Sequence, residues 1–159
     1  MLGTDHSAFV ARAARGFQGE MLDAYGLPPY VADPATGALC DTSRGVGNSY
    51  VCIYAPELYP DLARQWFESY ETNFWQKRIG AAGFREYPRN RPGAEQFLDY
   101  DVDAGPIIAG FSPAANAFGL AAARVNGRFD LAWPLAGQVL AASWPLPDGS
   151  LLGRAFFPI

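Results

Sequence analysis

Hydrophobic residues recur along this chain with the period of an α-helix, and the pattern predicts five helical segments. The clearest covers residues 60–78, where every fourth position carries a large apolar side chain. These positions are Leu62, Trp66, Tyr70 and Phe74. We expect them to lie in the core. The other helices are expected at residues 7–25, 45–54, 113–126 and 130–143.

Capping residues and prolines set the expected helix ends. Ser112 followed by Pro113 is typical of a helix N-terminus, because proline fits the first turn, where its missing N–H has no intrahelical partner. Ser7 is a candidate cap for the first helix, and Gly26 is a candidate residue to end it. Pro56 is expected to stop the second helix, since proline disfavours helical backbone at the residue before it.

Glycine and proline break the helical pattern between residues 80 and 110. Only short extended pieces fit there, such as residues 84–87 and 96–100. A segment of about thirty residues without regular structure is uncommon in a compact domain, and such loops are usually functional or disordered. Four aromatic residues favour order, so we interpret this segment as a functional loop. They are Phe84, Tyr87, Phe97 and Tyr100.

The predicted elements together indicate an all-α protein built of antiparallel helical hairpins with long ordered loops. A Pro-Asp-Gly turn at residues 147–149 adds one small β-hairpin, between residues 144–146 and 150–152. With 159 residues, the chain has the length of one domain, which we assign to residues 1–159.

Composition and charge exclude several classes of function. The 12 Lys and Arg residues are outnumbered by 16 Asp and Glu, and no basic run occurs, so we expect no nucleic-acid partner. No stretch approaches the ~20 apolar residues of a membrane span, and the chain does not open with a signal peptide. The protein is therefore expected to be cytoplasmic.

The cysteines and the histidine carry no recognisable cofactor or nucleophile motif. Cys40 and Cys52 match neither a redox pair nor a paired zinc knuckle, so we expect reduced thiols, no metal and no cofactor. His6 is the only histidine, so a Ser-His-Asp triad would depend on it, and no Gly-x-Ser-x-Gly motif supports one. We interpret His6 as a cap or surface residue.

Two polar clusters are suited to binding. In the first, at residues 33–48, Arg44 precedes a helix whose free N–H groups can bind an anion or hydroxyl; the alternative is a set of turn and capping residues. The second, at residues 85–91, combines guanidinium groups with aromatic rings, which suits carboxylate, phosphate or sugar recognition. Its alternative is a solvated surface strand. The candidate binding residues are Tyr30, Arg44, Asn48, Arg85, Tyr87 and Arg89.

The third cluster contains the best candidates for acid/base catalysis. Asp99, Asp101 and Asp103 alternate, so an extended backbone would place all three on one face, where like charges raise each other's pKa. An EF-hand loop counted from Asp99 fails, because Ala104 and Gly110 stand where glycine and glutamate are required. Simple neutralisation of nearby arginines is the alternative. The candidate catalytic residues are Asp101, Asp103 and Glu86.

These motifs resemble those of α/α-toroid proteins. Residues 33–48, with a Thr-Gly and an Arg-Gly pair, are similar to a hairpin loop of six-hairpin glycosidases, including unsaturated glucuronyl and rhamnogalacturonyl hydrolases. Residues 101–106, followed by a helix of small residues, also resemble toroid proteins. Residues 3–6 resemble, more distantly, toroids of the linalool dehydratase-isomerase type. The resemblance implies an aspartate general acid/base, for which Asp101 or Asp103 is the matching type.

The leading hypothesis is therefore a toroid-like hydrolase or lyase that acts on a small-molecule or carbohydrate substrate. Because a closed ring of six hairpins needs twelve helices, the chain resembles part of a toroid, and we expect a homo-oligomer or a missing remainder. One alternative is a non-catalytic helical interaction module. A second is terpenoid dehydration or isomerisation, which would need Cys40 or Cys52 near His6 in an apolar cavity.

Overall fold

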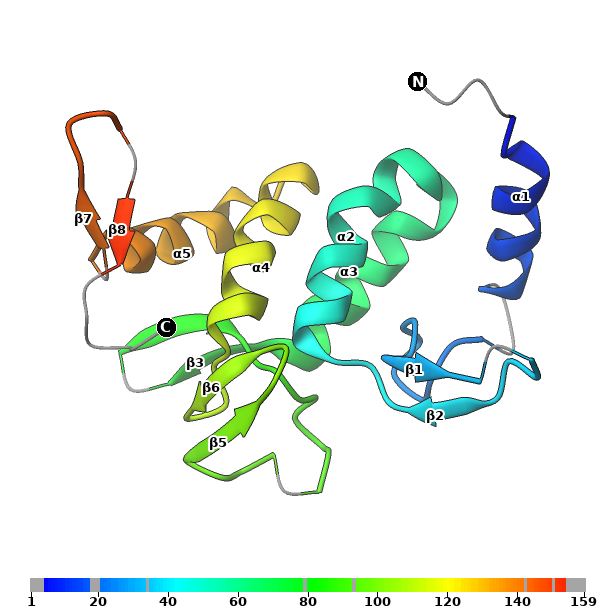
Figure 1. The fold of residues 1–159 in the computed structure, drawn as a ribbon, viewed down its shortest axis with the longest axis horizontal. Helices are drawn as coiled ribbons and strands as arrows, with labels where there is room; N and C mark the ends of the chain where they lie inside the picture. Colours follow the sequence, from blue (N-terminus) through cyan, green and yellow to red (C-terminus); the bar gives the residue numbers. More distant parts are fainter. Residues whose placement is uncertain are drawn as a thin grey trace.

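The computed structural model describes residues 5–17, 21–33, 35–78, 80–92, 94–141, 143–149 and 151–153. Within these ranges, five helices alternate with eight short strands (Figure 1). The helices are α1 (Ser7–Gly16), α2 (Gly45–Leu58), α3 (Pro60–Phe74), α4 (Pro113–Val125) and α5 (Phe129–Ala141). The strands are β1 (Val31–Ala32), β2 (Leu39–Asp41), β3 (Trp75–Arg78), β4 (Ala81–Phe84), β5 (Leu98–Asp101), β6 (Gly105–Ile108), β7 (Ser143–Pro145) and β8 (Leu151–Gly153).

The expectation of an all-α fold is wrong, because helices and strands are mixed. The strands form four separate antiparallel pairs, each between strands that are consecutive in the chain. Residues 75–108 therefore hold two β-hairpins in place of the expected irregular loop. Gly80 (φ +73°) and Gly105 (φ +74°) supply the left-handed backbone that closes these two hairpins. The hairpin expected near residue 147 is confirmed as β7–β8.

Three of the five expected helices have different ends in the structure. The first stops at Gly16, and Asp23 instead organises a turn by accepting hydrogen bonds from the Tyr25 and Leu27 N–H groups. The segment after Phe74 becomes strand β3, so this helix ends at the last residue of its apolar series and not at residue 78 as expected. At Ser112 the expectation is confirmed, since its Oγ accepts from the Ala115 N–H at 3.1 Å.

Helix α2 also differs, because it continues through Pro56 to Leu58. A proline inside a helix cannot donate to the carbonyl four residues earlier, which here belongs to Cys52. The side-chain amide of Asn126 donates to that carbonyl at 2.9 Å and replaces the missing bond. A contact from the end of α4 thus allows α2 to run one turn further than its sequence alone predicts.

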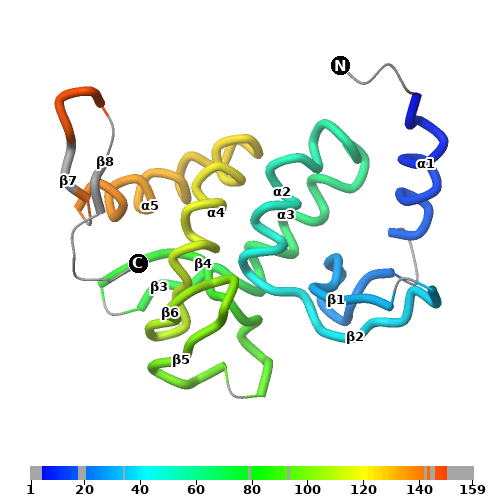
Figure 2. Tube along the Cα trace, viewed as in Figure 1, coloured from blue at the N-terminus to red at the C-terminus, as the bar shows by residue number. Residues whose placement is uncertain are grey.

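Helices α2 and α4 lie side by side, with α3 packed behind α2 and α5 packed against α4 (Figures 1 and 2). Both α2 and α4 begin at the end of the molecule where the β5–β6 hairpin lies, and β1–β2 lies beside the start of α2 (Figure 1). This arrangement gathers several loops around the N-terminus of α2. None of the described helices is long and apolar enough to cross a membrane.

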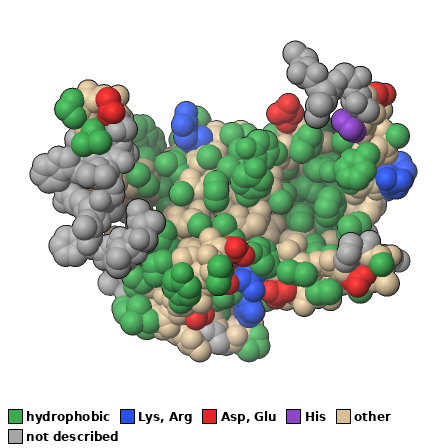
Figure 3. Space-filling model, in the orientation of Figure 1, with side chains coloured by type: hydrophobic (Ala, Val, Ile, Leu, Met, Phe, Trp, Pro, Cys, Tyr) green, Lys and Arg blue, Asp and Glu red, His purple; other side chains and the backbone are tan. Residues whose placement is uncertain are grey.

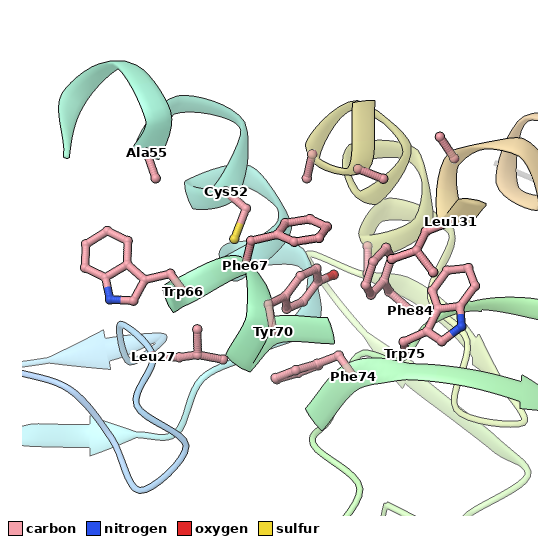
Figure 4. Close-up of a cluster of buried hydrophobic side chains, with 14 of the residues drawn as sticks. Leu27, Cys52, Ala55, Trp66, Phe67, Tyr70, Phe74, Trp75, Phe84 and Leu131 are labelled. Carbon is pink, nitrogen blue, oxygen red and sulfur yellow. The ribbon is translucent and has the colours of Figure 1, made fainter. Parts of the chain in front are cut away.

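The core lies between these helices and the β3–β4 hairpin (Figure 4). The predicted stripe of α3 is confirmed there for Trp66, Tyr70 and Phe74, which are at most 1% exposed, while Leu62 is partly buried against the core. The Tyr70 ring stacks on Phe84 of β4 with centroids 4.5 Å apart. Gly119 of α4 leaves room for Phe84, whose ring would be 2.4 Å from a Cβ atom at that position. Small residues therefore let α4 approach the hairpin closely.

Candidate functional site

Six candidate residues from four segments meet around the N-terminus of α2, and we name them the α2 cap cluster. They are Tyr30, Arg44, Glu86, Tyr87, Asp101 and Asp103. The segments are the turn before β1, the residue preceding α2, the loop after β4 and the turn of the β5–β6 hairpin. Residues up to 73 positions apart in the chain are hydrogen-bonded within it.

Arg44 is the centre of the cluster. Its Nη1 donates to Asp101 Oδ2 at 2.5 Å, while its Nε and Nη2 donate to Asp41 Oδ2 at 3.1 and 2.8 Å. Its guanidinium also lies over the Tyr30 ring, 4.4 Å from the centroid, and 5.6 Å from the centroid of Tyr87. A planar cation held between two carboxylates and two rings has a fixed orientation, as anion or hydroxyl recognition requires.

Asp101 has a structural role in addition to its ion pair with Arg44. Its Oδ1 accepts from the N–H groups of Asp103 and Ala104 at 2.9 and 3.0 Å, which shapes the β5–β6 turn. Burial alone would raise the pKa of Asp101, but these two N–H groups and the Arg44 charge outweigh it, so the pKa is lowered. Asp101 is therefore held ionised.

The expected row of three aspartates on one face is not present. Strand β5 ends at Asp101, so the alternation does not extend to Asp103, which lies in the turn. Asp99 accepts from its neighbour, the Tyr100 N–H, and is not part of the cluster. The expectation that like charges raise the pKa of these carboxyl groups is wrong for Asp101, because a cation and two backbone donors act on it more strongly.

Tyr30 and Asp103 form the exposed side of the cluster. The Tyr30 hydroxyl donates to Asp103 Oδ2, and Asp103 itself is exposed. This hydrogen bond, with smaller effects of burial and of the Asp103 charge, raises the pKa of Tyr30 to about 12. The phenol is thus a stable donor to the one cluster aspartate that solvent reaches freely.

Glu86 forms the buried side of the cluster. Its side chain is 0% exposed, and Oε2 accepts from the Val46 N–H at 3.2 Å in the first turn of α2. Its Oε1 has no hydrogen-bond partner among the described residues. Burial raises the pKa of Glu86 to about 7, against the opposing effects of the Ser112 hydroxyl and of the Val46 N–H. The cluster therefore holds one carboxyl group that titrates near neutrality and one that stays ionised.

Two residues that were not among the sequence candidates, Arg91 and Asp41, contact the α2 cap cluster. The Arg91 guanidinium also lies over the Tyr87 ring, 4.2 Å from the centroid, and its Nη2 is 3.9 Å from Asp41 Oδ1. Asp41 thereby joins Arg44 and Arg91. Both residues belong to the polar stretches noted in the sequence, but residue type alone did not separate them from their neighbours.

Three candidate binding residues have structural roles instead. Arg85 is 5% exposed and donates to Gln76 and to the carbonyl groups of Tyr87 and Ala94, so it braces the loop after β4. Arg89 donates to the Trp75 carbonyl. Asn48 is buried and donates to the carbonyl groups of Pro28 and Arg44, both at 3.2 Å. Arg85 and Asn48 are buried and are not available to a ligand in this structure, whereas Arg89 is exposed.

The cysteines and the histidine do not form the apolar site that terpenoid chemistry requires. Cys52 is 1% exposed within the core, and burial raises the pKa of its thiol to about 12. Cys40 is exposed on β2, and His6 is exposed where α1 begins. Among the described residues, no group of three or more His, Cys, Asp or Glu side chains is arranged to hold a metal ion.

Comparisons with protein-family models, with curated proteins and with solved structures find no match to this chain. The function is therefore argued from the geometry and chemistry of the α2 cap cluster.

Proposed function

We propose that the protein is a hydrolase or lyase that acts on a carbohydrate-type substrate by carboxylate acid/base catalysis at the α2 cap cluster. The observation that carries this proposal is the convergence of Arg44 with Asp103 through the ring and hydroxyl of Tyr30. Carboxylates, guanidinium groups and aromatic faces together suit a substrate that is rich in hydroxyl or carboxylate groups. Scattered positions for these residues would have favoured a purely structural role.

Asp103 is the group that exchanges a proton with the substrate in this proposal. It is the exposed carboxylate of the cluster, and the Tyr30 O–H orients it. Arg44 binds a substrate hydroxyl or carboxylate, since three of its N–H groups donate to Asp41 and Asp101 and two of the five remain. Tyr87 provides a half-buried ring beside it.

Asp101 and Glu86 act as positioning residues. Asp101 fixes both Arg44 and the turn that carries Asp103. Glu86, with no exposed surface, is out of reach of a substrate and anchors the loop after β4 to the start of α2.

The test is hydrolysis or elimination on a panel of nitrophenyl glycosides and unsaturated uronyl disaccharides. We expect Asp103→Asn to lower kcat/KM by about 10²–10⁴-fold, the usual contribution of a general acid or base. Asp99→Asn is the matched control, because Asp99 is an exposed aspartate of the same hairpin outside the cluster. Equal activity of the two variants, or no turnover of any panel member by the wild type, would show that the cluster is not catalytic.

A second candidate function is a non-catalytic module that associates with a second copy of the chain. An apolar groove of about 310 Å³ runs between α4 and α5. Its lining is Leu120, Arg124, Phe129, Ala132, Trp133 and Ala136. Phe129 and Trp133 are 57% and 75% exposed, and large exposed apolar patches commonly mark interaction sites. Light scattering tests this: a dimer mass that Trp133→Ser reduces to a monomer supports it, and a monomeric wild type rejects it.

A further inference from the structure

Three exposed aromatic side chains form a strip along the seam between α2 and α4. Tyr50, Tyr54 and Phe118 are 50%, 45% and 38% exposed. Their rings contact one another: the centroids of Tyr50 and Tyr54 are 5.0 Å apart, and those of Tyr50 and Phe118 are 5.5 Å apart in an edge-to-face arrangement. We name these three residues the aromatic strip.

The aromatic strip continues the α2 cap cluster along one face of α2. Positions 47, 50 and 54 share a helix face, because they are three and seven residues apart. At the first of these stands Gly47, and the Tyr30 ring lies where a side chain would be, 3.3 Å from a Cβ atom built there. The Tyr30 hydroxyl in turn donates to Asp103. Tyr30, which bonds to the exposed carboxylate, therefore lies against the same face of α2 that carries Tyr50 and Tyr54 one and two turns further on.

The surface view supports this continuity. On the face drawn in Figure 3, hydrophobic side chains gather over α2 and α4, and acidic and basic side chains adjoin them toward the start of α2. The strip is not uniformly apolar, since Tyr50 and Tyr54 carry phenol groups, and a hydrogen bond between these two groups raises the pKa of Tyr54. Aromatic rings with solvent-exposed hydroxyl groups suit a ligand that has both apolar faces and hydroxyl groups.

We infer that the aromatic strip binds successive sugar rings of an oligosaccharide or polysaccharide chain, one end of which reaches Asp103. The inference rests on the proposed function and names its substrate as a glycan chain instead of a single sugar. Sugar rings present flat C–H faces that pack on aromatic rings, and their hydroxyl groups bond to phenols. Gly47 allows the Tyr30 ring to lie close to α2, because a Cβ atom there would be 3.3 Å from the ring and would shift it slightly.

Affinity electrophoresis tests the inference with native gels that contain polygalacturonate, xylan, hyaluronan or mixed-linkage glucan. The wild type is expected to be retarded in at least one gel. Tyr50→Ala and Tyr54→Ala are expected to weaken that retardation at least fivefold, while Tyr50→Phe, which keeps the ring, retains most of it. Phe9→Ala is the matched control, because Phe9 is an exposed aromatic residue of α1, at 60%. Unchanged thermal midpoints establish that each variant is folded.

Asp103→Asn separates this inference from the proposed function. If Asp103→Asn stays retarded but loses turnover, both proposals hold; if it stays retarded and keeps turnover, the strip binds glycans and the catalytic proposal is wrong. The inference is overturned if no gel retards the wild type, or if Tyr50→Ala and Tyr54→Ala migrate like the wild type. It is also overturned if light scattering shows a wild-type dimer that Tyr50→Ala dissociates, because a second chain then covers the strip.

Discussion

Arg44 and Asp101 are joined by a hydrogen-bonded ion pair of 2.5 Å across 57 positions of the chain. Each side chain keeps 15% of its surface exposed, so the pair is largely withdrawn from solvent. Removing one partner of such a pair leaves a charge without its counterion in a place where water solvates it poorly. The pair joins the residue before α2 to the β5–β6 hairpin.

We therefore expect Asp101→Asn to lower the free energy of unfolding by about 1–3 kcal/mol, measured by urea denaturation. Asparagine keeps an oxygen that can accept from the Asp103 and Ala104 N–H groups, so this variant removes the charge while preserving the turn. Asp101→Ala removes both functions and is expected to cost more. Asp99→Asn serves as control, and a stability of Asp101→Asn within about 0.5 kcal/mol of the wild type contradicts the argument.

Most of the helices and most residues of the α2 cap cluster could be predicted from the sequence. Local signals sufficed where one residue decides the outcome, as for the Ser112 cap, whose Oγ accepts from the Ala115 N–H. Arg44, Asp101 and Asp103 could also be chosen as candidate site residues from residue type and spacing alone. The hydrogen-bond partner of each of these residues could not be predicted, because it depends on how the separate hairpins pack against α2.

The errors arise where a distant contact overrides a local pattern. Residues 75–78 carry basic side chains before Gly80, as a helix C-terminus often does, yet they form β3 because pairing with Ala81–Phe84 satisfies their backbone in a hairpin. Arg85 resembles a surface binding residue in sequence, but three of its N–H groups donate to Gln76 and to two carbonyl groups, which braces the loop after β4. Burial of this kind is a property of the assembled fold.

Gly45 is expected to be intolerant of a side chain. A Cβ atom there would lie 2.0 Å from the Arg85 carbonyl oxygen, and the Gly45 N–H donates to the Glu86 carbonyl at 2.7 Å. Both contacts are with backbone, so neither can move aside by a change of rotamer. Gly45→Ala should lower the unfolding free energy by about 3 kcal/mol or more, or prevent folding, as judged by circular dichroism and urea titration.

Gly137→Ala is the control for this prediction. Gly137 also lies within a helix, but no atom stands within 4 Å of its Cβ position. Alanine is the better helix former, so this variant should be more stable than the wild type by about 0.5–1 kcal/mol. Similar stabilities for the two variants would contradict the close approach of α2 to the loop after β4.

Asn126 is expected to stabilise α2 because Pro56 leaves a carbonyl group unpaired. Asn126→Ala removes the bond to the Cys52 carbonyl and should cost about 1–2 kcal/mol in urea denaturation. In a Pro56→Ala background, the new N–H can donate to Cys52, and the same change should cost less. A double-mutant cycle measures this difference directly, and purely additive effects would argue against the compensation.

Glu86 is expected to make the protein less stable as pH rises toward neutrality. Its folded pKa of about 7 lies above the ordinary value of about 4.3 for an unfolded chain, so between these values the folded state retains a proton that the unfolded state has released. The contribution of Glu86 to the free energy of unfolding is fully present below pH ~4 and decreases by about 3 kcal/mol by pH ~7. The lowered pKa of Asp101 places its own loss of stability on the acid side of this window.

Glu86→Gln tests this assignment, because glutamine is close in shape and carries no titrating group. Urea denaturation between pH 5 and pH 7.5 should show a falling stability for the wild type and a nearly level one for Glu86→Gln, so that the curves diverge with rising pH. The amide still offers an oxygen to the Val46 N–H, so the start of α2 should keep its cap. Parallel curves for the two proteins would mean that Glu86 is already ionised at pH 5 and that burial does not hold its proton.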